Sequence, residues 1–238
     1  MNVAGKLAAV ARKLREPGPA GPKLFRAMRK STHSLGLAPT ITVERAVMVE
    51  ARQPPKPTRA LSDLVIRRAG PADVPAVAAL DDRPASLLEG RLSRGDLIYL
   101  GQLDEQVVCA TCFHRGPAPF DEERAIFARW ALENDTTFWS YDAMAPAPMR
   151  ALGVVAKLLE VALKEVFELH GGRQVRGFIY DWNRLSLLLH ERMGFSVIAT
   201  MTAVGVPGVK WLRWESDGRS RQWVLRRNSD FALPPALA

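Results

Sequence analysis

The segment from Arg150 to Ala156 combines a cationic side chain with small residues at the expected start of a long helix. The first N–H groups of a helix have no partner within the helix, and the helix dipole favours negative charge there. The positions that would cap those groups hold Met149 and Arg150 and not Ser, Thr or Asp. The segment could therefore bind a phosphate through backbone amides, with Arg150 as a further donor. The same pattern also fits a helix end that is merely hydrated.

A second group of polar residues follows that helix. Asn183, Ser186 and His190 precede Gly194 and Phe195 in the spacing N-x-x-S-x-x-L-H-x-x-x-G-F. An imidazole titrates near neutral pH, so His190 could take part in proton transfer. It could equally be a polar helix residue with no catalytic role.

Cys109 and Cys112 form a C-x-x-C pair in an expected strand. On a strand these residues lie ~10 Å apart and on opposite faces, so they cannot share a metal ion or form a disulfide. No second cysteine pair completes a zinc site, and His114 nearby does not replace one. The sequence therefore predicts no metal site.

The two polar groups together resemble the paired motif of the GNAT superfamily of acyl-coenzyme A-dependent acyltransferases. In that superfamily V-x-P-x-x-R-G-x-G-I-G-x-x-L-L precedes N-x-x-[AS]-x-x-L-Y-x-x-x-G-F. The first half is represented here by Ala145, Ala147, Arg150, Ala151, Gly153, Val154, Val155, Leu158 and Leu159. The second half keeps Asn183, Ser186, Leu189, Gly194 and Phe195. The opening LVIRRAGPADVPAVAAL is also similar, so the resemblance covers about residues 63–204.

Four of the positions that depart from the family pattern bear on cofactor binding or catalysis. Ala147 stands at the proline position, Ala151 and Val155 stand at glycine positions, and His190 replaces a tyrosine. Alanine still offers its backbone N–H, whereas Val155 narrows the approach that a glycine would leave open.

The resemblance implies acyl transfer from acetyl-coenzyme A, or another acyl-coenzyme A, to an amine or hydroxyl of a small molecule, sugar or peptide. A splayed strand would present its end to the pantetheine, and the following loop would hold the pyrophosphate. The implied cofactor-binding residues are Met144, Ala145, Arg150, Ala151, Leu152, Gly153, Val154, Val155, Ala156, Asn183 and Ser186.

The resemblance also implies two candidate catalytic residues. His190 would replace the family's tyrosine as the general acid at the leaving thiolate. Asp142 would be a base or an anchor for the acceptor amine, although a strand-end carboxylate bonded to local backbone fits as well. Trp139 and Tyr141 alternate with Asp142 and are expected in the core.

The element order that must position these residues is β-α-α-β-β-β-α-β-α-β-β. Alternating apolar residues predict strands near 40–50, 64–69, 136–144 and 196–204, and a hairpin turns near Asp104-Glu105. Apolar residues at helical steps predict the long helix over about 150–169. The fold class is therefore α/β (α+β), with a mixed, mostly antiparallel central sheet flanked by helices and an N-terminal helical extension.

Charge separates the N-terminal arm from the rest. Residues 1–60 hold 12 Lys+Arg against 3 acidic residues, and the remainder holds 21 against 22. The domains are expected at 1–60 (basic extension and linker), 61–216 (GNAT-like) and 217–238 (C-terminal strand and tail). Residues 1–30 could contact a membrane surface or an acidic partner, or form a solvated extension or a helix that packs on the domain.

Composition limits the other function classes. The near-neutral domain argues against nucleic acid, although Trp211, Trp214 and Trp223 alternate with basic residues. Two cysteines are no disulfide framework, which fits a reducing, cytoplasmic setting. No run reaches ~18 apolar residues, so no membrane span is expected. A monomer or homodimer is expected.

Overall fold

The computed structural model describes residues 42–58, 61, 63–116, 137–150, 153–206, 209–216, 219–220 and 224–227. The expected helices of residues 1–30, as well as Ala151, Leu152, Trp223 and the C-terminal tail, lie outside the described residues. The described residues fall into two compact units. The larger comprises those within 48–179 and 184–198, and the smaller comprises those within 1–47, 180–183 and 199–238.

The larger unit holds most of the helices. Its elements are β2 (Val65–Arg68), η1 (Pro71–Asp73), α3 (Val74–Ala78), α4 (Ala85–Ser93), β3 (Leu97–Leu103), β4 (Gln106–Arg115), β5 (Thr137–Met144), α6 (Ala147–Arg150), α7 (Val154–Glu168), most of β6 (Gln174–Tyr180) and α8 (Arg184–Arg192). The strands lie in the order β6-β5-β4-β3-β2. The β5–β6 pair is parallel and the others are antiparallel. The expected mixed, mostly antiparallel sheet is therefore present.

The hairpin of β3 and β4 confirms the turn expected at Asp104-Glu105. Both turn residues have positive φ, 46° and 65°, which matches the right-handed twist of the flanking strands. The register shifts between Gly101 and Gln102, so that Leu97 pairs with Phe113. This shift decides which residues beyond the strand ends lie opposite each other.

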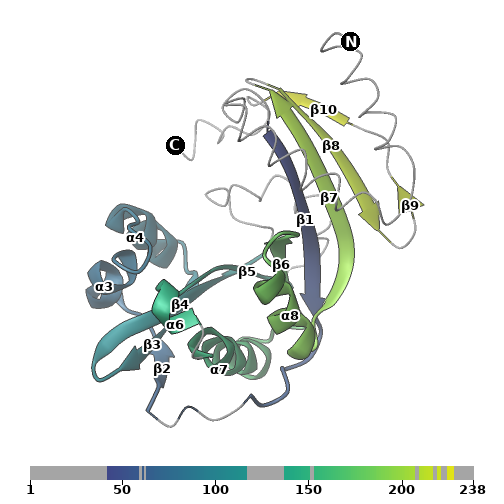
Figure 1. Ribbon diagram of the computed structural model, residues 1–238. Coiled ribbons are helices and arrows are strands. Elements are labelled where there is room, and N and C mark those ends of the chain that lie inside the picture. Colours follow the sequence, from purple (N-terminus) through teal and green to yellow (C-terminus); the bar gives the residue numbers. More distant parts are fainter. Residues whose placement is uncertain are drawn as a thin grey trace. The chain divides into compact units, whose positions relative to one another are not determined.

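Helices cover both faces of the sheet (Figure 1), with α3 packed on β4 and α7 packed on β3 and β4. The Cys109 thiol lies 3.9 Å from the Val154 carbonyl of α7, whereas the Cys112 thiol lies 3.8 Å from the Arg91 guanidinium of α4. The two cysteines thus point to opposite faces, as the strand pattern predicts. Both thiols are buried and unbridged, and burial raises the pKa of each to about 12.

The smaller unit is a set of antiparallel strands. β7 (Ser196–Val206) pairs with β8 (Val209–Ser216), and β8 also pairs with β9 (Arg219–Ser220) and β10 (Val224–Arg227). The first part of β1 (Thr42–Ala51) belongs here, where the Asp181 amide donates to the Arg45 carbonyl. β1 and β7 lie where the alternating patterns of residues 40–50 and 196–204 predict strands.

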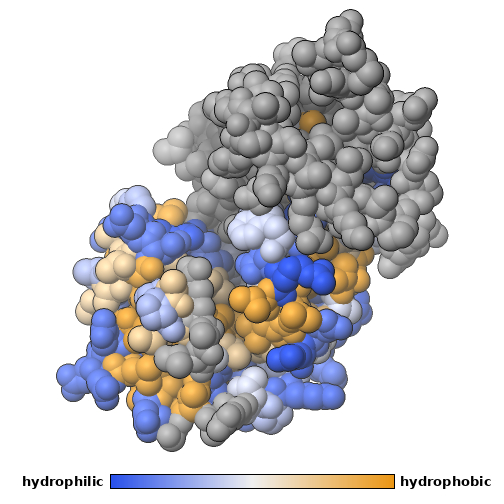
Figure 2. All heavy atoms as spheres, in the orientation of Figure 1, coloured by the Kyte–Doolittle hydropathy of each residue, from blue (hydrophilic) through white to orange (hydrophobic). Residues whose placement is uncertain are grey.

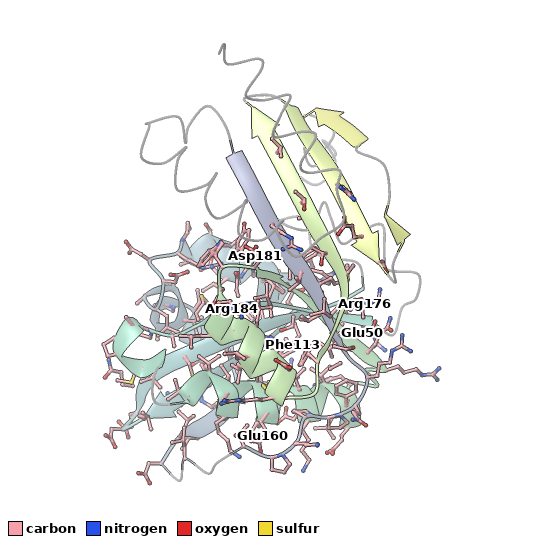
Figure 3. The ribbon with its side chains drawn as sticks, turned by 45° about the vertical axis from the view of Figure 1, so that its right-hand side comes forward. Glu50, Phe113, Glu160, Arg176, Asp181 and Arg184 are labelled. Carbon is pink, nitrogen blue, oxygen red and sulfur yellow. The ribbon has the colours of Figure 1, made fainter. Side chains whose placement is uncertain are left out.

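The end of β1 belongs to the larger unit. The domain boundaries expected at residues 60 and 216 remain predictions. Glu50 is buried and accepts a hydrogen bond from Arg176 Nε at 2.7 Å (Figure 3). Further along, the Thr58 amide donates to Glu160 Oε2 at 2.7 Å. The described part of the segment before residue 61 is thus tied to β6 and α7.

Figure 2 shows apolar residues reaching the surface between charged ones. The large apolar side chains that are exposed include those of Val65, Leu169, Leu185, Leu188 and Val197. No helix among the described residues is both long enough and apolar enough to cross a membrane.

Candidate active site

The expected long helix is in fact two helices. Residues 147–150 form α6, and α7 begins only at Val154, so the prediction of one helix over 150–169 was wrong at its start. Gly153 precedes α7 with φ 78° and ψ 9°, a left-handed conformation that favours glycine and interrupts the helix. Arg150 therefore ends the short helix rather than opening the long one.

The N-terminus of α7 has the properties expected of an anion site. Its first helical hydrogen bond runs from the Lys157 amide to the Gly153 carbonyl, at 3.1 Å. The amides of Val154, Val155 and Ala156 consequently have no acceptor within the helix, and no side chain of residue 153 caps them. The positive end of the helix dipole lies at the same place.

The strands next to this helix end separate. β5 and β6 pair through Thr137–Gln174, Phe138–Val175 and Trp139–Arg176, and no further pair forms between their described residues. A Cβ added at Gly177 of β6 would lie 3.0 Å from the Ser140 carbonyl oxygen of β5, so the two strands are still close one residue beyond the last pair. β5 nevertheless continues to Met144, so residues 140–144 do not pair with the described residues of β6, and we call this unpaired stretch the opening between β5 and β6. Met144 and Ala145 at its end are both buried.

A bulge in β5 lies beside this opening. Cys112 of β4 pairs with Tyr141, but Ala110 pairs with Met144, so β5 carries one extra residue. Asp142 has φ 53°, which is uncommon outside glycine and typical of a bulge. The bulge interrupts the alternation of side chains between the two faces of β5. Arg91 therefore contacts two consecutive residues, the Asp142 carboxylate and the Tyr141 ring.

The Asp142 carboxylate is held by two arginines. Arg83, from the connection between α3 and α4, donates to both carboxylate oxygens, one of them at 3.0 Å. Arg91 of α4 donates to Oδ2 at 2.6 Å, and its guanidinium lies 4.6 Å from the centre of the Tyr141 ring. The carboxylate therefore bonds neither to local backbone nor to open solvent, and this arrangement favours a positioning role over that of a base.

His190 lies in the core of the larger unit. Its Nδ1 lies 2.8 Å from the Ser186 carbonyl oxygen, which can only accept, so Nδ1 carries the proton. The ring packs edge-on against Phe195, with 4.9 Å between centres. Burial lowers the pKa of His190, and the hydrogen bond to Ser186 only partly opposes this. A neutral ring held in this way favours a packing role.

This burial predicts a pH dependence of stability. Below about pH 6.5, the ordinary pKa of histidine, His190 becomes protonated in the unfolded chain but stays neutral in the folded chain. The free energy of unfolding therefore falls as pH falls through this range. We expect His190→Phe to flatten the stability profile between about pH 7 and about pH 5. Urea unfolding across this range measures the slope. Leu188→Phe, which adds the same ring at an exposed position of α8 and removes no titratable group, is the control and should leave the slope unchanged. An unchanged slope in His190→Phe would contradict the assignment.

Asn183 and Ser186 fall in different units. Asn183 is exposed in the smaller unit, where its amide donates to the Tyr180 carbonyl at 2.9 Å. Ser186 lies in the larger unit on α8, with its carbonyl bonded to His190. Their expected contacts with a cofactor therefore remain predictions.

The structure also brings together a group that the sequence analysis missed. Asp96 directly precedes β3, and its side chain is fully buried. It accepts hydrogen bonds from His114 Nδ1 at 2.6 Å, from Arg94 Nη2 at 2.5 Å and from the Tyr141 hydroxyl. Among the described residues no group of three or more His, Cys, Asp or Glu could hold a metal ion.

Comparison with known proteins identifies the fold of this chain. No protein-family model and no curated protein sequence matches the chain. A GCN5-related N-acetyltransferase from Kribbella flavida superposes with a TM-score of 0.51 at 14% identity, covering 75% of this chain and 63% of that one. A GCN5-related glucosamine N-acetyltransferase region of a fungal multi-domain β-N-acetylglucosaminidase also gives 0.51, at 10% identity, covering 74% of this chain and 22% of that one. The chain therefore has the fold of the GNAT N-acetyltransferases.

Proposed function

We propose that this protein is an acyltransferase that moves an acetyl or other acyl group from acyl-coenzyme A to an amine or hydroxyl of a small molecule, sugar or peptide. One observation carries the proposal. The opening between β5 and β6 lies directly before an α7 N-terminus whose first amides have no acceptor within the helix. A cofactor with phosphates at one end and an extended arm at the other matches both features.

Different residues would bind the two ends of the cofactor. The amides of Val154, Val155 and Ala156 would hold phosphate oxygens, with the helix dipole adding favourable electrostatics. The part of β5 beyond Ser140 would align the extended arm, because this edge of the strand has left its partner. The bound acyl-coenzyme A supplies an activated thioester, and the protein must align it with the nucleophile and exclude water.

A second candidate function is a binding module that has kept the fold without the chemistry. The observation in its favour is that Asp142 is engaged by two arginines and His190 is buried and neutral. Release of free thiol from acetyl-coenzyme A in the presence of primary amines separates the two candidates, since a binding module releases none.

Acetyl-coenzyme A affinity tests the proposed site through Val155. This residue is the second of α7 and is partly exposed, and its branched side chain narrows the approach to the amides. We expect Val155→Ala to bind roughly threefold more tightly, about 0.7 kcal/mol, in a calorimetric titration. Val65→Ala, an equally small change at an exposed position of β2, is the control. Unchanged or weaker binding in Val155→Ala would contradict the assigned site.

A further inference from the structure

Asp96 and His114 form a carboxylate–imidazole pair that lies outside the proposed cofactor-binding residues. Burial alone would raise the pKa of Asp96, but hydrogen bonds from His114, Arg94 and Tyr141 outweigh it and lower the pKa. The carboxylate is therefore ionised at neutral pH and can only accept hydrogen bonds. It follows that His114 donates from Nδ1 to this carboxylate, which leaves Nε2 as the ring nitrogen that can accept a proton.

The carboxylate is fixed from three directions. His114 Nδ1 approaches Oδ1 at 2.6 Å, Arg94 Nη2 approaches Oδ2 at 2.5 Å, and the Tyr141 hydroxyl also donates to Oδ2. Because the Asp96 side chain has no exposed surface, these contacts leave it little freedom. A buried carboxylate that fixes the tautomer and orientation of an imidazole is the arrangement that prepares histidine to accept a proton.

The other ring nitrogen of His114, Nε2, belongs to a partly exposed side chain. The side chain is 17% exposed, and no described residue forms a hydrogen bond with Nε2. The neighbouring Gly116 has no side chain, and even a Cβ added there would lie 3.9 Å from His114 Nε2. A proton could therefore reach Nε2 from a bound molecule.

The position of His114 in the sheet fits a role in acyl transfer. His114 pairs directly with Trp139, which is the last β5 residue that also pairs with β6. It thus neighbours the closed end of the opening, whereas the α7 amides lie at the far end of β5. With its phosphates at α7, an extended cofactor would direct its thioester toward this closed end. Five residues of β5, about 17 Å, separate Trp139 from Met144.

Resting on the proposed acyl transfer, we propose that His114 is the catalytic base that accepts a proton from the acceptor, with Asp96 as its positioning residue. The acceptor nitrogen or oxygen forms a bond to the thioester carbonyl carbon, and the carbon–sulfur bond breaks. The sulfur leaves with the bonding pair as coenzyme A thiolate. The proton lost by the nucleophile passes to Nε2, and Asp96 stabilises the resulting imidazolium.

The test compares two kinds of amine with acetyl-coenzyme A, following thiol release. A primary amine, taken as the best of glucosamine, spermidine and a lysine-containing peptide, is protonated at neutral pH and needs a base. Hydroxylamine is already unprotonated and does not. We expect His114→Gln to lose about 100-fold in turnover with the primary amine and little with hydroxylamine. Asp96→Asn should show the same selective loss, smaller in size, and His170→Gln should show none.

Each outcome decides the proposal. Equal losses with both amines would mean a structural role for His114, and no loss with either would also overturn the inference; both results leave the proposed function standing. A calorimetric titration with coenzyme A should give the same Kd for wild type and His114→Gln, which shows that the variant is folded. A wild-type protein that binds acetyl-coenzyme A but releases no thiol with any of these amines overturns the proposed function, and the base role with it.

Discussion

Replacing Arg91 by methionine should lower the free energy of unfolding by about 3 kcal/mol, because it leaves a buried carboxylate without one of its two cations. Arg91 is only 2% exposed and donates to Asp142 at 2.6 Å. Methionine fills a similar volume, so the loss reports the charge and its hydrogen bond more than a cavity. Urea unfolding at neutral pH measures the effect. Arg83 still pairs with Asp142, which keeps the expected loss at the lower end of the range for a broken buried pair.

Two further variants separate the pair from general damage. Arg67→Met removes a half-exposed arginine that is paired with Asp73 at 2.6 Å, and should cost less than about 1 kcal/mol. Adding Asp142→Gly to Arg91→Met removes the carboxylate that has lost this partner, and glycine tolerates the φ of 53° at that position. The double variant should recover part of the loss. An Arg91→Met variant as stable as Arg67→Met would show that the arginine does not hold the bulge.

Leu158→Ala should cost about 3 kcal/mol of unfolding free energy, since a fully buried leucine leaves a cavity that the surroundings only partly fill. Leu158 lies on the buried face of α7, the helix whose N-terminus is the proposed phosphate site. Chemical denaturation measures the loss.

Leu185→Ala provides the matched comparison. This leucine also lies in a helix, α8, but is 80% exposed, so its truncation should change stability by no more than about 0.5 kcal/mol. Similar losses for the two leucines would contradict the packing of α7 against the sheet.

Hydrophobic periodicity was sufficient to predict most elements of the fold. The alternation of β1 and β7, and the turn at Asp104-Glu105, follow from local residue preferences that tertiary contacts do not overrule here. The spacing of the small residues predicted the start of a long helix near residue 150, whereas α7 begins at Val154. It did not reveal the break at Gly153, because one glycine inside a helical pattern is compatible with either a continuous helix or a left-handed stop.

The site residues were harder to predict, because two irregularities in the sheet decide them. If the register at the turn continued unchanged along the hairpin, Asp96 would lie opposite Phe113. The register shift between Gly101 and Gln102 places Asp96 opposite His114 instead. The bulge at Asp142 similarly lets one arginine reach two consecutive residues of β5. Such shifts arise from contacts between strands, and a single strand's sequence does not encode them.

The central claim is that the α7 N-terminus and the opening between β5 and β6 bind acyl-coenzyme A. Calorimetric titration of the wild-type protein with acetyl-coenzyme A tests it most directly. We predict one-to-one binding with a Kd between about 1 μM and about 1 mM, the range usual for enzyme substrates. No heat of binding at millimolar acetyl-coenzyme A would contradict it.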